Sequence, residues 1–200
     1  PDMPDPRSPA YLGALEELLF HTHVGMGGST LTLFTNRREM EAMYSVLKPR
    51  LAAEGLSLAC QTRGTSAKRL RERFIEDETS SLLALRTFWE GFDAGGDTLR
   101  CVVIAKLPFP LPTDPLATER ELRIQGAWGK FTLPEAVLTV KQAAGRLIRS
   151  STDRGCLVIA DSRVLSKRYG SRFLKSLPKV EHDAVPIGDV ADYLASWREG

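Results

Sequence analysis

The sequence has few of the features that mark membrane, secreted or strongly basic nucleic-acid-binding proteins. Its longest aliphatic runs, such as the CVVIA segment, are five residues long, whereas a transmembrane helix needs about 20 apolar residues. The amino-terminal end shows no signal-peptide pattern, so we expect neither a membrane span nor secretion, but a cytoplasmic location. Basic and acidic residues nearly balance, at 27 and 25, and the net charge of +2 restricts any contact with nucleic acid to a local surface.

Cysteine is scarce and forms no metal-binding pattern. Each of the three cysteines, Cys60, Cys101 and Cys156, lies within or beside an apolar run of strand type, which predicts reduced, buried thiols. His21 and His23 are two residues apart, but no carboxylate or cysteine joins them in the same segment. The sequence therefore predicts no metal site.

The motifs that bind the phosphates of ATP are also missing. No G-x-x-x-x-G-K-[ST] phosphate loop occurs, and the nearest string, from Gly64 to Lys68, has the wrong spacing and no second glycine. No D-E-A-H box is present either. We therefore expect that this chain does not hydrolyse ATP by itself.

The most informative feature that is present is the stretch QAAGRLIRS, which runs from Gln142 to Ser150. Gln142, Arg146 and Arg149 share one face of a predicted helix, about half a turn from its apolar face. Two guanidinium groups side by side suit charge-assisted bonds with phosphate oxygens, and Gly145 leaves room beside them. The alternative is a solvated arginine face on an ordinary amphipathic helix. The apolar face consists of Ala136, Val137, Val140, Ala143, Ala144, Leu147 and Ile148.

A second informative segment, LLALRTFWEGFDAGGDTLRCVVIAKLPFP, runs from Leu82 to Pro110. Together the two segments resemble the last motifs of superfamily 2 DNA helicases of the XPD-like and DinG-like branch, in which FWEGFD corresponds to motif V and QAAGRLIR to motif VI. The segment TLTLFTNRREM, from Thr30 to Met40, resembles motif IV. The likeness continues through DRGCLVIADSR and YGSRFLKSLP, so it covers nearly all of the chain.

In that family these motifs form the second of two RecA-like domains. The resemblance implies that a first, amino-terminal RecA-like domain binds most of the ATP and Mg²⁺ and is the partner of this one. An iron–sulphur cluster, which many members carry, would also lie in that other part of the protein. We accordingly expect the chain to be a piece of a longer helicase, with residues 1–9 as a linker or boundary and residues 10–200 as the helicase domain.

The resemblance also assigns roles to particular residues. Arg146 and Arg149 would be the catalytic arginine fingers that reach the ATP. Contacts with the nucleotide are assigned to Gln142, Gly145, Glu90, Gly91 and Asp93. Contacts with the backbone of single-stranded DNA are assigned to Thr35, Asn36 and Thr87.

The order of predicted elements indicates an α/β fold. Strands predicted at 29–36, 56–61, 81–87, 101–106 and 155–161 are separated by segments of helical length, which requires crossover connections and a mainly parallel sheet. The predicted helices span about 10–20, 38–53, 67–76, 115–125 and 134–149, with others near Arg168 and Val190. We expect a three-layer, RecA-like domain with helices on both faces of the sheet.

Ligands of open parallel sheets gather beyond the carboxyl ends of the strands. Thr35 and Asn36 follow the first predicted strand, the stretch from Thr87 to Asp93 follows the third, and the stretch from Lys106 to Pro110 follows the fourth. The DNA contacts are therefore expected at this edge of the sheet.

Other readings of these residues stay open. Asn36 is also a good helix cap, and Glu90 and Asp93 could cap a turn. Trp89 and Phe92 are expected to pack under the motif V loop, although stacking on a base is the alternative. Two alternatives remain for the chain as a whole, namely a catalytically silent binding module and the motor part of a nuclease–helicase fusion.

Overall fold

Every strand of the sheet is parallel to its neighbours. The computed structural model of the chain describes residues 1–85, 88, 98–111, 113–147, 154–178 and 182–200. In these ranges the strands lie in the order β2-β3-β1-β4-β5, so that β1 is central and β5 is an edge strand. The predicted α/β fold with a parallel sheet is confirmed. The strands are β1 (Thr30–Phe34), β2 (Ser57–Cys60), β3 (Ser80–Leu85), β4 (Cys101–Ile104) and β5 (Cys156–Ile159).

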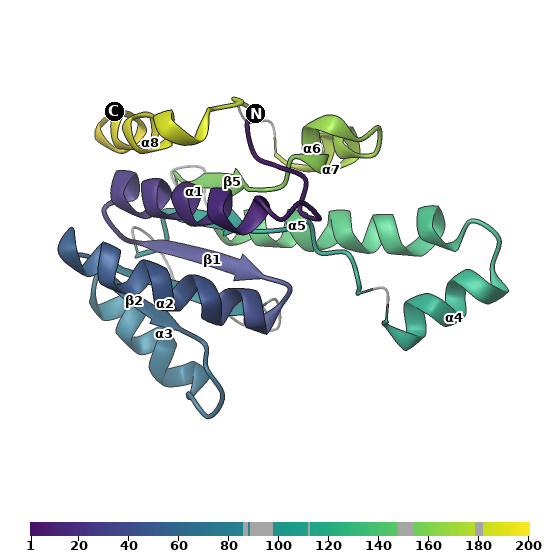
Figure 1. Cartoon of the computed structure of the whole chain (residues 1–200), viewed down its shortest axis with the longest axis horizontal. Helices are drawn as coiled ribbons and strands as arrows, with labels where there is room; N and C mark the ends of the chain where they lie inside the picture. Colours follow the sequence, from purple (N-terminus) through teal and green to yellow (C-terminus); the bar gives the residue numbers. More distant parts are fainter. Residues whose placement is uncertain (86–87, 89–97, 112, 148–153, 179–181) are drawn as a thin grey trace.

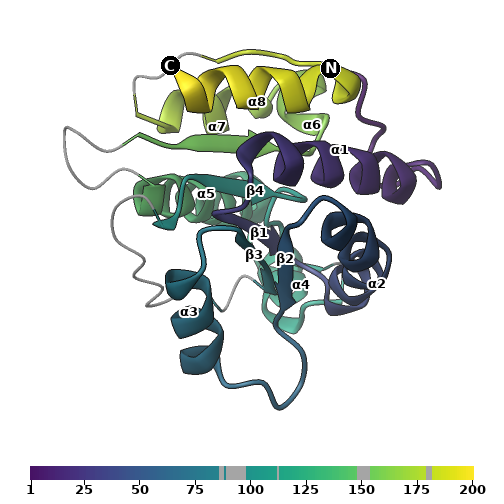
Figure 2. The ribbon, with the colours of Figure 1, turned by 90° about the vertical axis from the view of Figure 1, so that its left-hand side faces the viewer.

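Helices cover both faces of the sheet (Figures 1 and 2). On one face, α1, α2 and α8 pack over the strands, and on the other face α3 and α5 do so. Two short helices, α6 and α7, follow β5, and α7 packs against α5. The helices are α1 (Tyr11–Met26), α2 (Arg37–Ala53), α3 (Ala67–Glu76), α4 (Pro115–Arg123), α5 (Leu133–Leu147), α6 (Arg163–Ser166), α7 (Gly170–Ser176) and α8 (Val190–Glu199).

Alternate residues of each strand supply two separate hydrophobic clusters. In β4, Cys101 and Val103 belong to the cluster beneath α1, α2 and α8, whereas Val102 and Ile104 belong to the cluster beneath α3 and α5. This division follows from the two-residue period of a strand. Because both faces are covered, the strand reads as a continuous apolar run rather than an alternating one.

The first helix is longer than the range predicted from the sequence. Instead of ending near Phe20, α1 continues to Met26, because Thr22, His23 and Met26 still lie on its buried side. It stops at Gly27, whose φ of 66° is in the left-handed region that only glycine adopts without strain. Of the GMGG segment that was expected to end the helix, Gly25 and Met26 lie within α1 and Gly27 ends it.

The α5 helix begins with an irregular turn. Residues Trp128–Thr132 form a π-helical turn that leads into the α-helix at Leu133. Pro134 therefore lies in the first turn of α5, directly after this π-helical turn. The shorter helix before it, α4, projects away from the sheet (Figure 1) and buries none of its side chains.

The amino-terminal residues contact the body of the domain. The Asp2 carboxylate accepts a hydrogen bond from the Ile187 N–H at 3.1 Å, and the Ser162 hydroxyl donates to the Pro4 carbonyl at 3.2 Å. The predicted boundary after residue 9 itself remains a prediction. Among the described residues, none of the helices combines the length and the apolar character that crossing a membrane requires.

Candidate functional site

The helix that carries QAAGRLIRS has the two faces expected from the sequence. Ala143 and Leu147 are buried against the sheet, whereas Gln142 and Gly145 are exposed and Arg146 is partly exposed in the last turn. Outside its own helix and chain neighbours, a Cβ atom placed on Gly145 would meet no atom of the described residues within 4 Å. Arg149 lies outside the described residues.

Two residues from the motif V region pack beneath this same helix. Phe88, the first residue of motif V, and Leu99, which follows the motif, are both 2% exposed. They belong to the hydrophobic cluster that also contains Ala143 and Leu147 of α5. The predicted site residues Thr87, Glu90, Gly91 and Asp93 lie outside the described residues, as do Trp89 and Phe92. The start of motif V and the inner face of motif VI therefore share one core.

Motif IV lies at the carboxyl end of the central strand. Thr35 and Asn36 follow β1 directly and are half-buried. The Asn36 Oδ1 atom accepts a hydrogen bond from the Arg38 N–H at 2.9 Å, so Asn36 caps α2. Asn36 thus has the helix-capping role that the sequence analysis gave as its alternative. Because the cap uses the amide oxygen, the amide nitrogen still has its donors for another partner.

A glutamine that the sequence analysis did not single out joins three neighbouring segments. The Arg37 guanidinium donates to the Gln61 carbonyl oxygen at 2.9 Å, and the Gln61 side-chain oxygen accepts from the Leu85 N–H at 2.9 Å. Arg37 follows β1, Gln61 follows β2 and Leu85 ends β3. The position of Gln61 directly after an apolar strand is the signal that could have identified it, although that position alone does not specify the partner.

Asp161 was also not singled out, and it organises the carboxyl end of β5. Its side chain is fully buried and accepts a hydrogen bond from the Leu107 N–H at 2.8 Å. Arg163 pairs with the same carboxylate, with Nη2 2.6 Å from Oδ2 and Nε 2.9 Å from Oδ1. Burial acts to lower the pKa of Arg163, but the hydrogen bond and charge of Asp161 outweigh it and raise the pKa. Arg163 is therefore a fixed cation.

Lys106, which begins the segment predicted to follow the fourth strand, is held by ionic and aromatic contacts. Its ammonium nitrogen lies 2.6 Å from the Glu39 carboxylate and 4.7 Å from the centre of the Tyr11 ring. The Tyr11 hydroxyl in turn donates to the Ala105 carbonyl. These contacts account for Lys106 as a structural residue at the edge of the sheet.

The predicted site residues thus fall into two groups. Thr35 and Asn36 lie at the carboxyl edge of the sheet, as expected. Gln142, Gly145 and Arg146 lie instead in the last turns of α5, the crossover helix that leads back to the amino end of β5. The rule that ligands gather at the carboxyl ends of strands therefore locates motif IV but not motif VI.

Comparison with protein families identifies the family to which this domain belongs. The family described as helicase C-terminal domain matches residues 21–180. This chain belongs to that family. The resemblance to XPD-like and DinG-like helicases, predicted from the motifs, is confirmed by the relatives of the chain.

Two relatives illustrate how much of a longer protein this helicase C-terminal domain represents. The chain is 40% identical over 171 residues to the ATP-dependent DNA helicase YoaA of Haemophilus influenzae. The aligned region covers 84% of this chain and 26% of that protein. The chain is also 36% identical over 174 residues to the 3'-5' exonuclease DinG of Bacillus subtilis. In this case the aligned region covers 84% of this chain and 19% of that protein. The chain thus spans about a quarter or less of these relatives.

Solved structures of helicases share the fold of this domain. An apo XPD structure matches 85% of this chain and 35% of its own, with a TM-score of 0.64 and 21% identity. The structure of S. cerevisiae Dbp5 bound to RNA and ADP BeF3 matches 94% of this chain and 43% of its own, with a TM-score of 0.57 and 16% identity. At these identities the likeness establishes the RecA-like fold alone.

The predicted burial of the cysteines is confirmed for Cys60 and Cys101 but not for Cys156. All three are free thiols, and Cys60 and Cys101 are buried while Cys156 is half-buried. Burial raises the pKa of Cys60 to about 11 and that of Cys156 to about 12, so these thiols stay protonated and unreactive at neutral pH. No cluster of three metal-binding side chains occurs within the described ranges.

One of the two histidines considered as metal ligands is instead a core residue. His23 is fully buried, and its Nε2 atom lies 3.3 Å from the Thr32 hydroxyl of β1. Burial lowers the pKa of His23 to about 4. The imidazole is therefore neutral at physiological pH.

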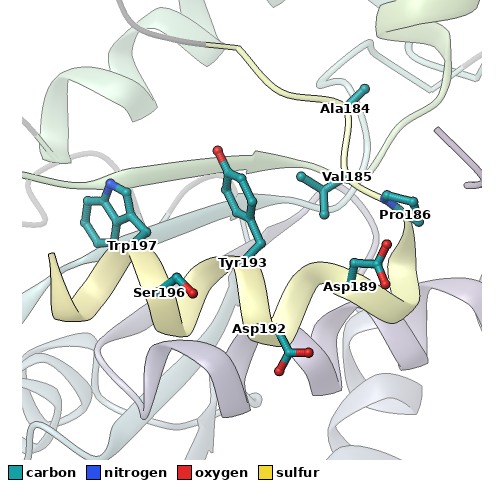
Figure 3. Close-up of a pocket in the computed structure, with 8 residues that line it drawn as sticks. All are labelled: Ala184, Val185, Pro186, Asp189, Asp192, Tyr193, Ser196 and Trp197. Atoms are coloured by element: carbon teal, nitrogen blue, oxygen red, sulfur yellow. The ribbon is translucent and has the colours of Figure 1, made fainter.

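An open pocket of about 740 Å³ lies between α8 and the chain that precedes it (Figure 3). The Tyr193 hydroxyl at its rim donates to the Asp183 carboxylate. None of the predicted site residues that the structure describes lines this pocket. Its lining consists of Ala184, Val185, Pro186, Asp189, Asp192, Tyr193, Ser196 and Trp197.

Proposed function

We propose that the chain is the carboxyl-terminal motor half of an ATP-dependent DNA helicase. The observation that carries this proposal is the packing of the helicase motifs. Phe88, which begins motif V, and Leu99, which follows the motif, share a core with the inner face of α5, and the outer face of α5 presents Gln142, Gly145 and Arg146 to solvent. Such a surface suits ATP held on a facing domain.

In this proposal Arg146 and Arg149 act on ATP bound by a first RecA-like domain. That domain would supply the phosphate loop and the Mg²⁺ site, which this sequence lacks. During phosphoryl transfer, negative charge spreads over the equatorial oxygens of the γ-phosphate, and a positioned guanidinium stabilises that charge. Gln142 and Gly145, with Glu90, Gly91 and Asp93 of motif V, would surround the nucleotide. Hydrolysis would then release the two domains and allow a step along the strand.

The same proposal places single-stranded DNA at the carboxyl edge of the sheet. Thr35, Asn36 and Thr87 would contact its phosphates, which position a strand without reading its sequence. The amide nitrogen of Asn36, which the helix cap does not use, supports this role. We further propose that the protein acts in the cytoplasm.

A second candidate is the motor part of a nuclease–helicase fusion. It is favoured by one observation, which is that the Bacillus subtilis relative is named a 3'-5' exonuclease. The motor role of this domain would be the same in either protein.

The proposal is tested with the longer protein that contains this domain and its first RecA-like partner. We expect ATP hydrolysis that rises on addition of single-stranded DNA, and ATP-dependent displacement of a labelled strand from a partial duplex. Binding of DNA without any hydrolysis would contradict the proposal and would support the silent binding module. Nuclease activity that survives removal of ATP, beside ATP-driven strand displacement, would identify the fusion.

A further inference from the structure

An arginine of α3 packs against the first residue of motif V. The guanidinium carbon of Arg71 lies 5.4 Å from the centre of the Phe88 ring, a distance at which a cation is attracted to the face of an aromatic ring. Phe88 is 2% exposed and belongs to the hydrophobic cluster beneath α3 and α5. The buried residues that α3 contributes to this cluster are Leu70 and Phe74. Arg71 therefore adds a cation to the side of α3 that meets motif V.

The surroundings of Arg71 differ from those of the other charged residues of α3. Every other lysine, arginine or glutamate of the helix is exposed, and Lys68 and Glu72 lie 3.8 Å apart as an ion pair along its surface. Arg71 is half-buried, and in the described part of the chain its buried Nε atom has no hydrogen-bond partner. One cation of α3 thus lies against an aromatic ring with an unpaired N–H group.

A residue that only filled this position would not need a guanidinium group. A donor that is buried without a partner generally costs more free energy than a cation near the surface gains from an aromatic ring. Methionine has a flexible, unbranched side chain that packs well against aromatic rings and carries no donor. The arginine is therefore better explained by a part in the reaction than by a contribution to stability.

The place of Phe88 in the chain indicates what the arginine holds. Phe88 directly follows Thr87, to which the proposed function assigns a DNA contact, and lies two residues before Glu90, to which it assigns a nucleotide contact. The same ring shares its cluster with Ala143 and Leu147 of α5, the helix that carries motif VI. A displacement of Phe88 would therefore move motif V relative to motif VI, and the DNA contact relative to the ATP.

We propose that Arg71 is a positioning residue for motif V, which holds Phe88 so that DNA bound at motif V accelerates the hydrolysis of ATP. This role rests on the proposed helicase function. Arg71 acts through the Phe88 ring and needs no contact of its own with ATP or DNA. Its guanidinium combines a planar group, which stacks on the ring, with a permanent positive charge, and neither lysine nor methionine offers both.

A double-mutant cycle in the 200-residue chain tests the contact itself. Urea unfolding is measured for Arg71→Met, for Phe88→Leu, for their combination and for the unchanged chain. Arg71→Met should be at least as stable as the unchanged chain, because it removes the unpaired buried N–H group. The two changes should depart from additivity by roughly two- to fivefold in the unfolding equilibrium constant. Additive effects would show that the side chains do not interact and would overturn the proposal.

The ATPase rate of the longer protein, with and without single-stranded DNA, tests the role in the reaction. Arg71→Met should lower the ratio of the stimulated to the unstimulated rate by roughly fivefold or more, while the unstimulated rate and the KM for ATP stay unchanged. Arg71→Lys should show a similar loss, because an ammonium group lacks the planar stack. The matched control is Arg73→Met, which removes an exposed arginine of the same helix and should keep the full ratio.

The outcomes separate this role from the proposed function. If the unchanged protein is stimulated by DNA and the Arg71→Met protein is stimulated equally, the positioning role is wrong and the function stands. If Arg71→Met lowers the unstimulated rate as much as the stimulated one, the role is also wrong, because Arg71 would then support hydrolysis itself and not its response to DNA. If the unchanged protein shows no DNA-stimulated hydrolysis, the proposed function is wrong and this role falls with it.

Discussion

Gln61 and Leu85 are joined across two neighbouring strand ends. The Gln61 side-chain oxygen accepts a hydrogen bond from the Leu85 N–H at 2.9 Å, and its carbonyl oxygen accepts from Arg37. Leu85 is the last residue of β3, two residues before Thr87 in the chain, and Arg37 directly follows Asn36. One glutamine thus links the two segments to which we assign DNA contacts.

Replacing Gln61 by alanine should destabilise the domain. The Leu85 N–H would lose its partner in a half-buried position, which costs about 1 to 3 kcal/mol. Gln61→Glu keeps an acceptor oxygen for the same N–H and serves as the matched control, with a smaller loss. Urea unfolding of the three proteins measures the difference. Equal midpoints for Gln61→Ala and the unchanged chain would show that the link contributes nothing.

Stability should also depend on pH through His23. Its pKa in the folded chain is lowered to about 4 by burial, whereas an unfolded histidine titrates near 6.5. Between these values the unfolded state binds more protons, so stability is highest above about pH 6.5 and falls as the pH drops towards 4. At 1.36 kcal/mol per pKa unit, the loss reaches about 3 kcal/mol.

Unfolding free energies measured between pH 7 and pH 4 check this expectation. His23→Gln should give a flatter profile than the unchanged chain, because its side chain does not titrate. A His23→Gln profile as steep as that of the unchanged chain would assign the pH dependence to other groups.

Asn36 allows capping and DNA binding to be separated. Asn36→Ala removes the cap of α2 and should cost about 1 kcal/mol of stability. Asn36→Asp keeps a capping oxygen but removes the amide donor and adds a negative charge, so it should preserve stability and still weaken DNA binding. Combined with Thr35→Ala and Thr87→Ala, either change should weaken binding further. If Asn36→Asp binds single-stranded DNA as well as the unchanged chain, the role of Asn36 is capping alone.

The chain by itself should not hydrolyse ATP, with or without single-stranded DNA. This expectation follows from the missing phosphate loop and the missing D-E-A-H box. A coupled assay of phosphate release on the purified chain measures it. DNA-stimulated release that co-purifies with the chain through successive columns would overturn it.

Much of the fold follows from local patterns in the sequence. Runs such as CVVIA predict buried strands because both faces of a parallel sheet are covered. The spacing of Ala143 and Leu147 predicts the buried side of α5, which leaves Gln142 and Arg146 on its outer side. These features depend on a residue and its near neighbours in the chain.

The contacts of Gln61 and Asp161 could not be predicted in the same way. Each side chain binds a backbone N–H that is distant in the sequence, at Leu85 and Leu107. Which N–H lies opposite depends on strand order and register, and no local pattern encodes these. The ring contacts among Phe109, Trp128 and Tyr169 likewise join segments that only the folded chain brings together.

The most direct test of the central claim is the ATPase rate of the longer protein with Arg146→Ala. Because a positioned guanidinium stabilises charge that develops during phosphoryl transfer, turnover should fall by about 10³- to 10⁵-fold, while nucleotide affinity falls only modestly. Arg146→Lys should not restore the rate, since lysine lacks the planar fork. Lys141→Ala, at an exposed position of α5, is the control and should hydrolyse ATP normally. Near-normal turnover by Arg146→Ala would contradict the assignment of this helix to the ATP site.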